Sequence, residues 1–137
     1  MDDQPRIPDY SGACVSNLTP ALLEPGVASP SWLPEAAAEA DQVVLLVLDG
    51  LGWDQLQDRR ALAPTLAAMA GGPISTVAPS TTATALTSIA TGASPAEHGV
   101  VGYRVAVEDS VLNVLRWSTP DGDARRSISP ADFQAET

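Results

Sequence analysis

The chain has 137 residues, of which 45% are hydrophobic and 18% charged, and this balance is typical of a globular protein rather than a disordered one. It contains seven arginines, no lysine and 17 acidic residues, so its formal net charge is -10. This charge argues against binding to nucleic-acid backbones or anionic lipid, because both depend on cationic side chains. A bound phosphate would need backbone N–H groups or metal ions instead, and the surplus of carboxylates suits metal ions.

The N-terminal end differs in composition from the rest of the chain. Residues 1–40 carry six of the twelve prolines, spaced too closely for a long helix or strand. We therefore predict an arm over residues 1–40 and a folded α/β domain over residues 41–137. The first ten residues are acidic and lack an apolar signal core, and the longest aliphatic run is too short to span a bilayer. We expect a cytoplasmic chain that does not enter the membrane.

That aliphatic run, Val43–Leu48, is uninterrupted and rich in β-branched residues, which predicts a strand buried on both faces of a parallel sheet. Asp49 follows directly, and Gly50 allows a sharp turn after it. Ligands of open α/β sheets bind beyond the carboxyl ends of the strands, so Asp49 is a candidate metal ligand. Its position alone also fits a carboxylate that only caps a turn or a helix.

The remaining pattern alternates helices and strands. A short helix is expected to begin at Glu35, and two more are expected over Trp53–Gln57 and Pro64–Ala70. The expected strands cover Pro73–Val77, Val100–Val107 and Val111–Trp117. We therefore predict an α/β fold with Val43–Leu48 at the centre of a largely parallel sheet, flanking helices, and a strand pair near residues 102–117 at the sheet edge.

A hydroxyl-rich stretch, residues 80–91, is ambiguous by propensity but has helical spacing. Its apolar residues Leu86, Ile89 and Ala90 recur at helical intervals, and Gly92 suits a helix end. We predict a helix here.

Three adjacent hydroxyls, Ser80, Thr81 and Thr82, stand at the start of this predicted helix. If Ser80 or Thr81 caps it, the capping oxygen is occupied by N–H groups of the first turn, and Thr82 keeps its oxygen for chemistry. A threonine becomes a nucleophile when a metal ion, a base or a helix N-terminus stabilises its alkoxide. A base is hard to find, because His98 is the single histidine and the nucleophile pattern G-x-S-x-G is absent.

These segments resemble the type I phosphodiesterase/nucleotide pyrophosphatase family of the alkaline phosphatase superfamily. The resemblance rests on VVLLVLDGLGW, APSTTATALTSIATG and PAEHGVVGY, in that order, over roughly residues 42–117. It implies an alkaline-phosphatase-like fold and a hydrolase of phosphodiesters or nucleotide pyrophosphates that uses two divalent metal ions, usually zinc. Asp49 matches the aspartate that binds one metal. Thr82 matches the metal-contacting nucleophile, which forms a covalent phosphothreonine.

The sequence departs from the family pattern in two respects. Ala85 occupies a position that is asparagine in vertebrate nucleotide pyrophosphatases, so their substrate pocket is not carried over. The family's other metal ligands lie further downstream, and we therefore expect this chain to be an N-terminal part that is inactive alone. His98, within P-x-x-H-G, is expected to give structural support rather than to bind metal.

Two kinds of function remain open from the residues. The first is the hydrolase, with a small phosphoester or nucleotide as its partner. The second is a noncatalytic α/β fragment or binding module, in which Asp49 and the threonines only cap helices and close turns. The stretch Gly50-Leu51-Gly52 is no dinucleotide fingerprint, because the third glycine is missing.

Overall fold

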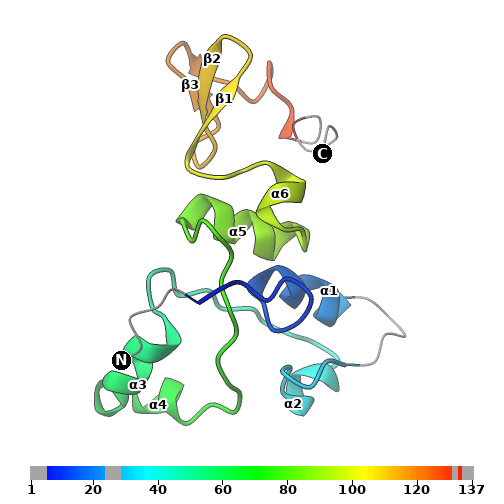
Figure 1. The fold of residues 1–137 in the computed structure, drawn as a ribbon, viewed down its shortest axis with the longest axis vertical. Coiled ribbons are helices and arrows are strands. Elements are labelled where there is room, and N and C mark those ends of the chain that lie inside the picture. The colour runs from blue at the N-terminus through cyan, green and yellow to red at the C-terminus, as the bar shows by residue number, and fades with distance from the viewer. Residues whose placement is uncertain (1–5, 24–28, 131–132, 134–137) are drawn as a thin grey trace. The chain divides into compact units, whose positions relative to one another are not determined.

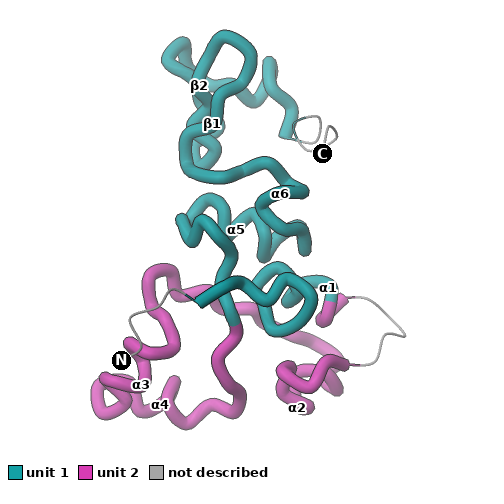
Figure 2. Tube along the Cα trace, in the orientation of Figure 1, with its two compact units in different colours: residues 1–20, 75–137 teal, residues 21–74 magenta. Residues whose placement is uncertain are grey.

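The computed structural model describes residues 6–23, 29–130 and 133. Parts of the predicted arm, residues 1–5 and 24–28, lie outside this description. The contacts divide the chain into two units, residues 1–20 with 75–137 and residues 21–74 (Figure 2). Within the described ranges, no helix is long and apolar enough to cross a membrane.

The unit of residues 21–74 is built from short helices and turns. Pro64 occupies the first turn of its helix, where its missing N–H costs nothing, and Glu35 places a carboxylate in the favourable first turn of another. These helices form where they were predicted, although the one at Pro64 is shorter. Their bounds are α2 Glu35–Ala38, α3 Trp53–Asp58, the 3-10 helix η2 Arg60–Leu62 and α4 Pro64–Ala67.

The predicted central strand over Val43–Leu48 is wrong. These residues form no strand, and all six side chains are exposed, from 42% for Val47 to 91% for Val44. A buried strand needs neighbouring strands to take its backbone N–H and C=O groups, and other elements to cover its two faces. No strand in the described ranges pairs with this segment. The largely parallel sheet of the predicted alkaline-phosphatase-like α/β fold is therefore not observed.

The sheet that does form is antiparallel and lies after residue 103. Its first two strands pair so that Val107 faces Ser110, which leaves a two-residue turn at Glu108 and Asp109. This hairpin confirms the predicted strand pair, with shorter strands than expected. Leu112 on the second strand is fully buried. The four strands follow one another in the order β1 Arg104–Val107, β2 Ser110–Asn113, β3 Ser118–Thr119 and β4 Gly122–Asp123.

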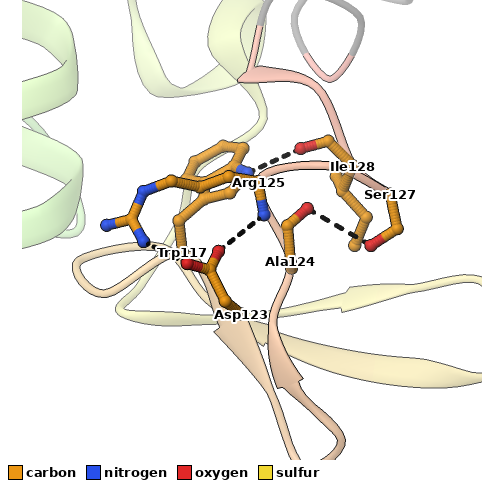
Figure 3. A network of polar contacts seen from close by, with 6 residues as sticks. All are labelled: Trp117, Asp123, Ala124, Arg125, Ser127 and Ile128. Carbon is orange, nitrogen blue, oxygen red and sulfur yellow. Dashed lines mark hydrogen bonds and ion pairs between the residues drawn. The ribbon is translucent and has the colours of Figure 1, made fainter.

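Polar contacts fasten the end of the described chain to this sheet. The Trp117 indole N–H donates to the Ile128 carbonyl at 2.7 Å, and the Trp117 ring meets Phe133 edge-on at 5.9 Å. The backbone N–H and guanidinium of Arg125 hold the pKa of the Asp123 carboxyl below its usual range. Figure 3 shows this network of Trp117, Asp123, Ala124, Arg125, Ser127 and Ile128.

The predicted strand over Pro73–Val77 is reduced to one isolated parallel bridge, in which Ser75 pairs with Cys14. Ser75 donates its backbone N–H to Ala13 and accepts the N–H of Val15. The bridge is short because η1, a 3-10 helix over Val15–Asn17, begins at once and carries the chain away from an extended path. It brings η1 next to the segment that leads into the longest helix.

That longest helix, α5 Thr82–Thr91, packs against η1 and against α6 Pro95–His98 (Figure 1). Gly92 ends α5 at φ 75°, a left-handed conformation that favours glycine, and a Cβ there would lie 2.7 Å from Pro20 Cγ. The buried residues of this region include Cys14, Ser16, Val77, Ala83, Thr84, Ser88, Pro95, His98 and Val100.

Candidate functional site

Thr82 is the first residue of α5. The N-cap before it is Thr81, whose extended backbone (φ -77°, ψ 152°) directs the chain into the helix. Thr82 is half-buried, in agreement with the predicted helix and with the expected place of Thr82 in its first turn. The first-turn N–H groups and the helix dipole create a partial positive charge at this end, where an anionic group is stabilised.

Thr81 stands at the N-cap position, one of the two caps that the sequence allowed, but its side chain does not cap the helix. It makes no hydrogen bond to the first-turn N–H groups, and its Oγ1 lies 2.9 Å from Oγ1 of Thr84 instead. Thr84 is fully buried, and a buried hydroxyl is costly without a partner. Thr81 supplies that partner from one turn earlier. Its oxygen is thus engaged by another hydroxyl rather than by the backbone.

Asp49 lies in the other unit, in an exposed turn. The Leu51 N–H donates to the Leu48 carbonyl at 3.2 Å across this turn, and Gly50 adopts φ 76° within it. The sequence had left a turn carboxylate open as an alternative to a metal ligand, and the structure shows the turn. Thr82 and Asp49 therefore belong to different units, and neither unit contains both.

A metal centre is not assembled by the described residues themselves. Among them, no group of three or more histidine, cysteine, aspartate or glutamate side chains is arranged to hold a metal ion. A tetrahedral zinc site needs several such ligands, and a two-metal site needs more. The described part of the chain therefore does not fit a complete two-metal centre.

His98, the last residue of α6, is 2% exposed and has a partner at each ring nitrogen. Its Nδ1 accepts the backbone N–H of Val100 at 3.0 Å, so Nε2 carries the proton of the neutral ring. Nε2 lies 2.8 Å from Oγ of Ser88 on α5 and donates to it. Burial lowers the pKa of His98, which favours this neutral form. These contacts support the expected structural role.

The hydrogen bonds of the Ser88–His98 pair run in the wrong direction for a Ser/His/Asp triad. In a triad, the serine gives its proton to the imidazole, and the second ring nitrogen donates to a carboxylate. Here the second nitrogen, Nδ1, accepts from Val100, and Ser88 is fully buried. The pair therefore does not serve as a nucleophile and base. Sequence inspection missed Ser88, because no spacing rule connects two residues ten positions apart in separate helices.

A capping box positions α6 and with it His98. The Ser94 backbone N–H donates to Oε2 of Glu97 at 2.6 Å, while the Ser94 side chain accepts the backbone N–H of Glu97. The hydrogen bonds from Ser94 hold the pKa of the Glu97 carboxyl below its usual value. The sequence signal was present as Ser94-x-x-Glu97, which begins two residues after Gly92 ends the previous helix.

Comparison with known families gives one result that covers most of the chain. Residues 43–131 match the family model described as type I phosphodiesterase / nucleotide pyrophosphatase. No significant match was found among curated proteins or solved structures. The matched range contains Asp49, Thr82 and His98.

Proposed function

Because the chain belongs to the type I phosphodiesterase/nucleotide pyrophosphatase family, we propose that it carries the nucleophile of a metal-dependent hydrolase of phosphodiesters or nucleotide pyrophosphates. The family itself consists of phosphodiesterase- and pyrophosphatase-type hydrolases. The observation that supports the proposal for this chain is the placement of Thr82, within the matched range, as the first residue of α5.

The proposed reaction has two steps. In the first, Oγ1 of Thr82 gives up its proton to solvent and attacks phosphorus, the new O–P bond forms, and the bond to the leaving oxygen breaks. In the second, water attacks the phosphorus bound to Thr82, which still carries the other ester group of the substrate; the Thr82 O–P bond breaks, the hydroxyl is restored and a phosphomonoester is released. The positive end of α5 stabilises negative charge on the phosphoryl oxygens in both steps.

The metal part of the proposal concerns two oxygen ligands of this chain. We propose that the Asp49 carboxylate and the Thr82 oxygen contribute to divalent-metal binding, with zinc as the expected ion. The remaining ligands of two sites are not supplied by the described residues. The substrate would be a small phosphoester or nucleotide, in keeping with a chain of net charge -10 that does not favour nucleic-acid backbones.

The nucleophile is tested by trapping the covalent intermediate. In the active protein, an acid quench during turnover of a chromogenic phosphodiester, followed by mass spectrometry, should locate on Thr82 a phosphoryl group that still carries the second ester substituent of the substrate. Thr82→Ala should lose the chemical step by several orders of magnitude, whereas Thr81→Ala, the matched control at the adjacent hydroxyl, should remain active. Phosphate on Thr81 or Ser80, with Thr82→Ala still active, would overturn the assignment.

Calorimetry with zinc tests the ligand count separately. The purified 137-residue chain should not bind two zinc ions tightly, because Asp49 and Thr82 supply too few ligands for two tetrahedral sites. Two tight sites formed by this chain alone would contradict the proposal.

A further inference from the structure

The imidazole of His98 is a buried polar group with a hydrogen-bond partner at each ring nitrogen, and it joins three segments. It stands at the end of α6, donates from Nε2 to Ser88 on α5, and accepts at Nδ1 from the backbone of Val100. All three residues are buried, with exposed fractions of 0% for Ser88, 2% for His98 and 3% for Val100. The ring therefore ties the start of the segment leading to β1 to the central helix.

The neutral state of the ring is essential to this connection. Only an unprotonated Nδ1 accepts the Val100 N–H, and that N–H is buried with the ring as its partner. A second proton on Nδ1 would set two donors against each other and place a positive charge in the core. Both effects oppose the closed arrangement, because an unmatched buried donor and an uncompensated buried charge are costly.

The surroundings offer little to stabilise such a charge. Neither α5 nor η1, which packs on α5, contains a charged residue, and Cys14 before η1 directs its thiol to the Thr76 carbonyl. On α6, the acidic group is Glu97, which is exposed and hydrogen-bonded to Ser94, and burial lowers the pKa of His98 by more than the negative charge of Glu97 raises it. Between α6 and β1, residues 99–103 are uncharged, and Arg104, the first charged residue beyond them, is exposed.

We propose that His98 is an acid-sensitive latch that holds the segment after α6 against α5 and releases it when the ring takes up a second proton. Gly99, at φ 69°, provides the flexible point next to the latch, because glycine crosses between left- and right-handed conformations without steric cost. The segment released begins at Val100 and runs into β1.

The direction of the pH effect follows from the lowered pKa of His98. In the unfolded or open state, the pKa of the ring lies near its ordinary value of 6.5. In the closed state, the pKa lies below that value, because burial disfavours the charged form. The stability of the closed latch is therefore greatest and independent of pH well above 6.5. Its stability falls as the pH drops from there toward the pKa of the closed form, because the open state binds more protons in that range.

Amide hydrogen exchange, followed by NMR on the ¹⁵N-labelled chain, tests the latch. The protection factor of the Val100 amide should fall by up to about tenfold per pH unit below 6.5, until the ring itself titrates. The signals of this single histidine report its pKa in the same samples. The internal reference is the amide of Leu56 in α3 of the other unit, which donates to the carbonyl of Gly52. Its protection should show no such trend.

Two variants separate the latch from a purely structural contact. His98→Asn keeps an amide oxygen near the position of Nδ1 but cannot titrate, so the pH dependence of Val100 protection should disappear. Ser88→Ala keeps the ring and its contact with Val100, so the pH dependence should remain even if overall protection falls. The proposal is overturned if the ring titrates at or above 6.5 with Val100 protection unchanged, or if His98→Asn retains the wild-type pH dependence.

Discussion

The α5–α6 region and the segment Val43–Leu48 reverse the usual relation between polarity and burial. In the first, the polar residues Thr84, Ser88 and His98 are fully enclosed, while in the second, six aliphatic side chains are exposed. Each polar group around α5 has a hydrogen-bond partner, whereas no described strand pairs with the aliphatic run. The comparison shows that the available partner, and not hydrophobicity by itself, decides which residues this chain buries.

The largest difference in stability between the two regions is expected when either of two glycines with nearly the same φ is replaced by alanine. Gly92, after α5, has φ 75°, and Gly50, after the aliphatic run, has φ 76°. A Cβ at Gly92 would clash with Pro20, whereas a Cβ at Gly50 would meet no atom within 4 Å. Gly92→Ala should therefore cost about 3 kcal/mol, from backbone strain plus overpacking, and Gly50→Ala about 1 kcal/mol from strain alone.

Urea unfolding of both glycine variants measures this difference. Equal losses of unfolding free energy at the two positions would show that the close approach of Gly92 to Pro20 does not contribute to stability.

A pair of valines gives the next largest effect. Val100 is 3% exposed beside the His98 latch, and Val44 is 91% exposed in the aliphatic run. Val100→Ala should destabilise by about 2 kcal/mol, because it removes two buried methyl groups and leaves a cavity. Val44→Ala should stay within about 0.5 kcal/mol of wild type. Thermal unfolding monitored by circular dichroism compares them, and a loss at Val44 as large as at Val100 would mean that the aliphatic run is buried in solution.

The smallest effect concerns the capping box that begins α6. The pKa of Glu97 is lowered by its hydrogen bonds with Ser94, so its stabilising contribution is present above the ordinary value of 4.5 and is lost as the pH falls through the lower pKa of the folded form. Glu97→Gln should weaken this acid dependence, since the amide does not ionise. Melting temperatures between pH 3 and 6 provide the test. An unaltered profile for Glu97→Gln would contradict the assignment.

Elements defined by local signals were predictable from the sequence. The helix α5 begins beside Thr81 and ends at Gly92, and the hairpin of β1 and β2 turns at Glu108–Asp109, as the spacing of apolar and turn residues indicated. Such elements depend on hydrogen bonds between residues close in the chain, so nearby residues carry the necessary information. The position of Thr82 in the first turn of α5 was predictable for the same reason, while its chemical role stays a proposal.

The environment of each element was decided only by the tertiary structure. Val43–Leu48 has the composition of a buried strand, but composition records a preference for burial and does not supply the neighbouring strands that burial requires. The contact of Ser88 with His98 likewise depends on how α5 and α6 pack, which no local pattern states. Local hydrogen bonds are specified over a few residues, whereas burial is a property of surfaces that the folded chain brings together.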